Sequence, residues 1–125
     1  MNISDHHSVY KKSIYLIVYT IVNILKVVRV SLSFEWSRTK SHVNRKKHGI
    51  AFEEAAEVFD DFYALEYYDD THSNMHEDRF CVIGSMYNGL IVFVVYKPVN
   101  INRVRIISAR KASKEERRCY EKNIT

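Results

Sequence analysis

The sequence has little glycine, proline or cysteine, with three, one and two of these residues among 125. So few glycines and prolines exclude a long flexible linker or a low-complexity segment, and no repeat occurs at a solenoid period. Cys81 and Cys119 lie far apart, and neither belongs to a CxxC or Cys/His ligand pattern. We therefore expect a compact fold whose cysteines are reduced and structural, as in a cytosolic protein.

Apolar content and charge set the next limits. Hydrophobic residues make up 46% of the chain, which at this length is enough for one globular domain but not for two. Nineteen Lys and Arg residues against 15 Asp and Glu give a formal charge of +4 and a pI near 9.1. This modest basic excess favours an anionic partner.

The apolar run at residues 14–25 is the irregular part of the chain. It resembles a weak signal or membrane helix, but a bilayer span needs about 20 largely apolar residues, and small residues for signal cleavage are missing. Its β-branched residues would also suit an added strand. We favour a third interpretation, in which residues 1–32 extend in front of a folded domain at 33–125, and translation begins near Val30 or Leu32.

The periodicity from residue 34 onward predicts an α+β fold. Ser37 can cap a first helix that ends at Gly49, Ala51 offers no side-chain cap to a second, and Ser113 opens a third with a capping box. We expect helices at 37–49, 52–59 and from 113 onward, and strands at 34–36, 64–68, 79–86, 90–96 and 103–109. The strands should form an antiparallel sheet packed against the two N-terminal helices and followed by the C-terminal helix. The strand at 90–96 is apolar without alternation, which is typical of a central strand covered on both faces.

The strand at 103–109 and the residues that follow it carry several arginines. A guanidinium group keeps its charge and can grip a phosphate through two parallel hydrogen bonds, so this segment suits anion binding. Arginines on an edge strand are also commonly solvated, or protect the edge from aggregation.

Several segments in a fixed order resemble the BrnT family of type II toxins. They are FEW at 34–36, KHGI at 47–50, FEEA at 52–55, and RIISAR with its following alanine at 105–112. The resemblance spans roughly residues 34 to 120, and one departure is Ser37, where we expect an aspartate; serine also caps a helix.

The resemblance implies a fold similar to RelE-type toxins and a cytoplasmic ribonuclease that inhibits translation. It also implies neutralisation by a BrnA antitoxin, whose ribbon-helix-helix part binds operator DNA, so that operator DNA is reached only through the antitoxin. Two toxins and two antitoxins would form one complex. Expression without the antitoxin would then arrest growth.

Metal-free RNA cleavage requires a base for the 2′-hydroxyl, cations for the pentacoordinate phosphate and an acid for the leaving oxygen. Arg79 and Arg105 share the strand parity of Cys81, so they are expected on one sheet face, with Arg110 just past the strand end. The catalytic candidates are His48, Glu77, Arg79 and Arg110, and the RNA-binding candidates are Lys47, His72, Arg105 and Lys111. A histidine at a helix end is also a partner of the helix dipole, and Glu77 could simply pair with Arg79.

The loop at 69–78 holds carboxylates and two histidines, but a polar loop collects such residues by chance, so we expect neither a metal site nor a cofactor. The competing function class is a non-catalytic module that binds nucleic acid or protein. A further alternative is a protein that is tethered to a membrane through residues 14–30. Loss of toxicity in Arg79→Ala or Arg110→Ala with the fold intact would separate an enzyme from such a module.

Overall fold

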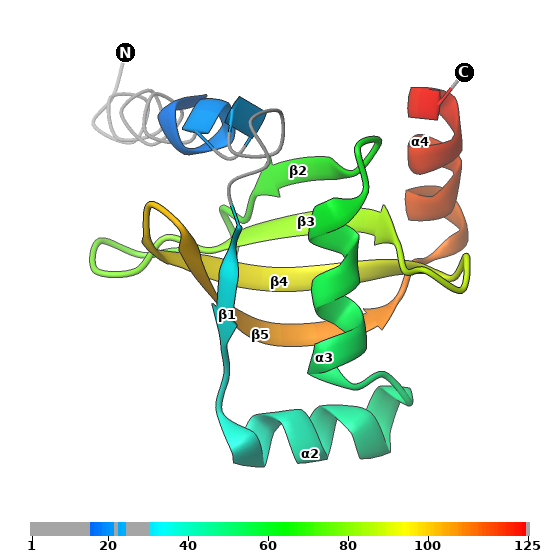
Figure 1. Cartoon of the computed structure of the whole chain (residues 1–125), viewed down its shortest axis with the longest axis horizontal. Helices are drawn as coiled ribbons and strands as arrows, with labels where there is room; N and C mark the ends of the chain where they lie inside the picture. Colours follow the sequence, from blue (N-terminus) through cyan, green and yellow to red (C-terminus); the bar gives the residue numbers. More distant parts are fainter. Residues whose placement is uncertain (1–15, 22, 25–30, 125) are drawn as a thin grey trace. The chain divides into compact units, whose positions relative to one another are not determined.

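The computed structural model describes residues 16–21, 23–24 and 31–124 of the chain (Figure 1). The chain divides into two compact units, residues 1–31 and residues 32–125. The described part of the first unit is helical rather than extended, which argues against the added strand there. Within the described residues, no helix has both the length and the apolar character needed to cross a bilayer. Val30, the first of the two start positions considered, lies outside the described residues.

The second unit is an α+β fold built on one five-stranded sheet. Its elements are β1 (Ser33–Glu35), α2 (Arg38–His48), α3 (Phe52–Ala55), the 3-10 helix η1 (Ala56–Asp60), β2 (Leu65–Tyr68), β3 (Phe80–Ser85), β4 (Ile91–Asn100), β5 (Arg103–Lys111) and α4 (Lys114–Ile124). The sheet order is β1-β5-β4-β3-β2, and β2 to β5 form the expected antiparallel meander. The expectation of a wholly antiparallel sheet is wrong, because β1 pairs in parallel with β5. A three-residue strand carries no pattern that identifies its partner.

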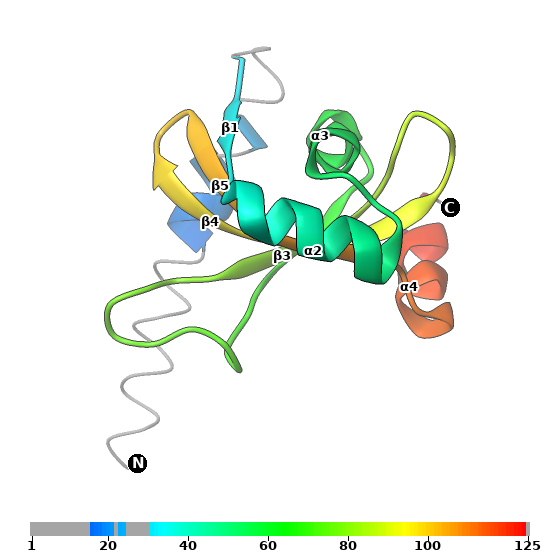
Figure 2. The same ribbon diagram turned by 90° about the horizontal axis from the view of Figure 1, so that it is seen from below.

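The two faces of the sheet are covered differently. Packing contacts join α2 and α3 to β5, η1 to β3, and α4 to β3, and Figure 2 shows α3 and α4 on opposite sides of the sheet. Residues 80–84 of β3 are therefore buried in succession, whereas β4 alternates between buried and half-buried positions. β4 is the central strand, as predicted, but alternate positions along it are only half buried, so the strand buried on both faces is β3.

The helix ends follow local sequence signals. The Ser37 hydroxyl accepts a hydrogen bond from Lys40 N at 3.3 Å, and Gly49 closes α2 with a φ of 74°. Ala51 makes no side-chain cap, and the expected second helix becomes the short α3 followed by η1. At α4, Ser113 N donates to Glu116 Oε1 at 2.7 Å and Glu116 N donates to Ser113 Oγ at 3.1 Å, which confirms the capping box.

Asn44 joins α2 to the edge of β5. Its Nδ2 donates to Ala109 O at 2.8 Å and to Ile50 O at 3.3 Å, and its Oδ1 accepts from Ala109 N at 3.1 Å. The parallel neighbour of β5, β1, pairs only with residues 103–105. The Asn44 amide therefore satisfies the backbone of Ala109 where the sheet has no further strand.

We expect Asn44→Ala to lower the free energy of unfolding by about 2–4 kcal/mol, because it leaves the buried N–H and C=O of Ala109 without partners. Urea unfolding of the full chain measures this. Lys46→Ala, at an exposed position of the same helix, should change stability by less than about 0.5 kcal/mol. Equal stability of the two variants would contradict the role given to Asn44.

Candidate active site

A β-bulge in β5 determines which arginines share a face of the sheet. Val95 pairs with Ser108 and Tyr96 with Ile106, so Ile107 is an extra residue without an opposite partner. The bulge reverses the side-chain alternation between Arg105 and Arg110, and both arginines lie on the face opposite the buried side chains of β5. We call this the polar face; it also carries Cys81, Lys97 and Arg79.

The first charge cluster on the polar face is centred on Glu77. Arg79 Nε donates to Glu77 Oε2 at 3.2 Å, and Lys97 Nζ lies 3.2 Å from Glu77 Oε1. Lys97 and then Arg79 hold the pKa of the Glu77 carboxyl below its usual range, against the opposing effect of desolvation. Glu77 is consequently a weak base, better suited to hold the two cations than to accept a proton.

The second cluster is centred on Glu35, from the parallel edge strand. Arg103 Nε donates to Glu35 Oε1 at 2.8 Å, and Arg105 Nη1 donates to Glu35 Oε2 at 2.7 Å. Hydrogen bonds from Arg103 and Arg105 lower the pKa of this carboxyl. Lys97 and Arg105 are cross-strand partners, so the two clusters are neighbours on the sheet.

Arg110 lies at the other end of the polar face, roughly 15 Å from Arg105 along β5 at about 3.3 Å per residue. Both of its terminal nitrogens bind Glu116, at 2.8 and 2.9 Å, and its guanidinium stacks on the Phe93 ring at 4.2 Å. We expected Arg110 just past the end of the strand, but β5 continues to Lys111, so Arg110 lies within the strand. The structure therefore brings Arg79 and Arg105 together and leaves Arg110 apart from them, in a bidentate pair that fastens α4 to the sheet.

The proton-transfer candidates lie in two different places. His48 ends α2, which lies along the open edge of β5 (Figure 1) with Asn44 bound to Ala109 beyond the bulge, so His48 is not assembled with Glu77 and Arg79. His72 lies in the loop between β2 and β3, where its Nδ1 is 2.9 Å from Asp69 Oδ2.

Hydrogen bonds anchor this loop to Arg79. Asp69 N donates to Arg79 O at 2.8 Å, and Arg79 N donates to Ser73 Oγ at 2.8 Å. Asn74 Oδ1 accepts hydrogen bonds from the backbone N–H groups of the two residues before Asp78. The polar side chain of Asn74 therefore stabilises a turn of the loop. Among the residues that the structure describes, no group of three or more His, Cys, Asp or Glu side chains is placed to hold a metal.

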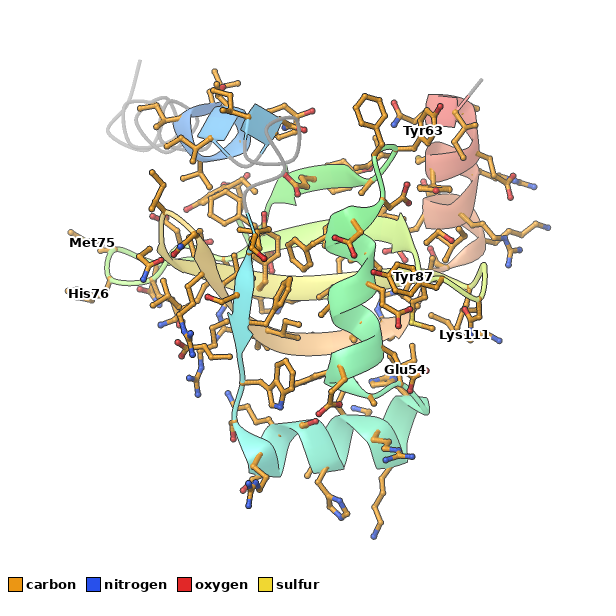
Figure 3. The ribbon with its side chains drawn as sticks, viewed as in Figure 1. Glu54, Tyr63, Met75, His76, Tyr87 and Lys111 are labelled. Atoms are coloured by element: carbon orange, nitrogen blue, oxygen red, sulfur yellow. The ribbon has the colours of Figure 1, made fainter. Side chains whose placement is uncertain are left out.

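The remaining candidates stand away from the charge clusters. Lys47 is exposed on α2 and Lys111 is exposed at the end of β5. Figure 3 shows Lys111 at the opposite end of the sheet from Met75 and His76, which form the tip of the loop before Arg79. Cys81 is buried, and desolvation raises its pKa to about 12, so it cannot serve as a thiolate nucleophile.

Sequence reasoning missed Glu35, Lys97 and Asp69. Lys97 was detectable in principle, since it continues the alternation of β4 beyond the end predicted at residue 96. Glu35 pairs with arginines far away in sequence, and no local pattern indicates that contact. Asp69 is distinguished from its neighbours in the loop only by its contact with His72.

We expect Glu116→Gln to destabilise the fold by about 1 kcal/mol at pH 7, since the Arg110 pair is half exposed and screened. Arg110 holds the pKa of Glu116 below its ordinary 4.5, so this stabilisation is present above pH 4.5 and is lost as the pH falls below it. Urea unfolding at pH 7 and pH 3 measures the difference, which should be smaller at the lower pH. Glu115→Gln is the matched control; if its pH dependence equals that of Glu116→Gln, the ion pair is not the cause.

Three comparisons with known proteins bear on this site. A family model described as ribonuclease toxin, BrnT, of type II toxin-antitoxin system matches residues 36–116, which include both ends of the polar face. The chain is similar to the Brucella abortus ribonuclease toxin BrnT, whose crystal structure was determined at 1.1 Å resolution. The identity is 26% and the TM-score 0.53, over 67% of this chain and 100% of that chain. The search of curated proteins found no match. The family match covers well over half of the sequence, and the chain therefore belongs to the BrnT family of ribonuclease toxins of type II toxin-antitoxin systems.

Proposed function

We propose that this chain is an endoribonuclease that cleaves RNA without a metal ion and thereby inhibits translation in the cytoplasm. The observation that carries the proposal is the pair of neighbouring charge clusters at one end of the polar face. Their four cations are held by only two carboxylates, Glu35 and Glu77, so a surplus of positive charge remains. Family membership supports the reaction class, since a toxin of this kind has an RNA substrate and an antitoxin partner.

The clusters suit a phosphate that gains negative charge during cleavage. Among the described residues, Arg105 donates only to Glu35, and only through Nη1. Its Nε and Nη2 therefore remain available to bind a phosphate. Arg79 uses Nε and Nη2 on Glu77 and keeps Nη1. Carboxylates that fix these guanidinium groups preorganise donors for the pentacoordinate phosphate, which is where such groups contribute most to rate.

We assign proton abstraction to His72, positioned by Asp69. Imidazole is the side chain that exchanges protons near neutral pH, and a carboxylate on Nδ1 leaves Nε2 as the acceptor. His72 would take the proton of the 2′-hydroxyl, whose oxygen attacks the adjacent phosphorus and displaces the 5′-oxygen. Lys97 and Arg105 would stabilise the charge on the departing oxygen, which then takes a proton from solvent. In this scheme Glu77 positions the cations, and His48 has no part.

The partner assignments rest on the family. We propose neutralisation by a BrnA-type antitoxin with a ribbon-helix-helix part, a complex of two toxins and two antitoxins, and contact with operator DNA only through the antitoxin. We also propose that the fold is of the RelE type, with α3 and α4 on opposite sides of the sheet and α2 along the edge of β5 (Figure 1, Figure 2).

The full chain should cleave end-labelled RNA in the presence of EDTA. Arg105→Gln should reduce the rate by about 10²-fold or more, because it removes a fixed cation at the phosphate. His72→Gln should reduce it by about 10²-fold through loss of the base. The rate of product formation at saturating RNA is the measurement.

Arg118→Gln is the matched control, since it removes one exposed arginine of α4 outside both clusters. Its rate should equal that of the parent chain. Cleavage that stops in EDTA and returns with a divalent ion would contradict the metal-free reaction. Unchanged rates in Arg105→Gln and His72→Gln would refute the assigned site.

A further inference from the structure

Helix α2 concentrates positive charge that has no carboxylate partner among the described residues. Five of its eleven residues are Lys or Arg, and it contains no Asp or Glu. Within the described residues none of these five cations forms an ion pair, whereas Arg79, Arg103, Arg105 and Arg110 of the polar face all bind carboxylates. Unpaired cations gathered on one helix are the usual electrostatic footprint of a polyanion site.

The helix dipole accounts for only part of this charge. Arg45, Lys46 and Lys47 lie in the last turn, where cations complement the negative end of the dipole. Arg38 is the first helical residue, where a positive charge opposes the dipole, and no acidic residue occupies the first turn. The presence of Arg38 is therefore not explained by a contribution to the stability of α2.

A groove of about 460 Å³ lies along the same helix. Arg38, His42 and Arg45 recur at i, i+4 and i+7, so they project from one side of α2 into the groove. Trp36 and Glu53 also line it. Its volume is within the roughly 300–1,000 Å³ of small-ligand sites.

Trp36 gives the groove an aromatic surface held by the core. Its ring meets that of buried Phe52 edge-on, with centroids 6.1 Å apart and planes at 78°. The side chain is only half buried, so part of the ring remains accessible in the groove. A fixed aromatic ring beside cations is the combination on which single-stranded nucleic acids stack.

We propose that this groove binds a nucleotide of single-stranded RNA, with the base on Trp36 and the sugar-phosphate backbone along Arg38 and Arg45. Glu53 also lines the groove, and its carboxylate can accept hydrogen bonds from a base amino group. This inference rests on the proposed ribonuclease function and adds to it a second RNA contact outside the polar face.

The chain connects the two RNA contacts directly. Glu35 holds Arg103 and Arg105 on the polar face, and the next residue is Trp36, which lines the groove on the side of α2. Both residues lie at the β1 edge of the sheet. An RNA strand that crosses this edge passes from the groove to the charge clusters within a few nucleotides.

The single tryptophan of the chain reports on the groove. A 2′-O-methyl RNA of roughly ten nucleotides, within the site sizes of single-strand binders, cannot be cleaved through the 2′-hydroxyl and should quench Trp36 fluorescence in the full chain. Arg38→Gln/Arg45→Gln should weaken binding at least about tenfold at low salt and lower the salt slope by about 1.4, the value for two phosphates. Arg117→Gln/Arg118→Gln removes the same charge from α4 and should bind like the parent.

Trp36→Phe retains a ring against Phe52 and should weaken binding of fluorescently labelled RNA by several-fold. Absence of quenching, or equal affinity of Arg38→Gln/Arg45→Gln and the parent, would overturn the proposal. Quenching by an acidic peptide but not by the RNA would assign the groove to a protein partner and would overturn it too. Binding in the groove without cleavage of ordinary RNA would instead uphold the groove and refute the ribonuclease function.

Discussion

The register of β5 is the constraint on which the rest of the structure depends. Ile107 is the extra residue of a bulge, and without it Arg105 and Arg110 would point to opposite faces of the sheet. Two contacts on the open edge of β5 secure this register. Parallel β1 pairs with residues 103–105 before the bulge, and the Asn44 amide binds both backbone groups of Ala109 after it. The same strand thus positions one charge cluster, the α4 anchor and helix α2.

Charge pairing separates structural cations from those available to a ligand. Arg110 binds Glu116 through both terminal nitrogens and stacks on Phe93, so it joins α4 to the sheet. Arg79 and Arg105 are fixed by carboxylates but keep free donors, which suits a developing phosphate charge. The cations of α2 have no carboxylate partners among the described residues and would contribute affinity in a salt-dependent way. In the function that we propose, the polar face would carry the chemistry and the groove would bind RNA, on two sides of one sheet edge.

Local signals in the sequence predicted local structure well. Ser37, Gly49 and the Ser113 capping box marked the helix ends, and the meander followed from short strands separated by turn residues. Non-local features escaped prediction: the parallel partner of β1, the bulge at Ile107, and the pairing of Glu35 with arginines of β5. Sequence parity placed Arg79 and Arg105 on one face correctly, but it could not place His48, since its position depends on the packing of α2 along the open edge of β5.

The central claim is that RNA binds at the polar face and crosses the β1 edge into the groove. NMR spectra of the full chain, recorded with and without an uncleavable 2′-O-methyl RNA, test it most directly. The account predicts that the side-chain Nε–Hε signals of Arg79 and Arg105 and the Trp36 indole signal shift together at the same RNA concentrations. Shifts confined to α4, with these three signals unmoved, would contradict it.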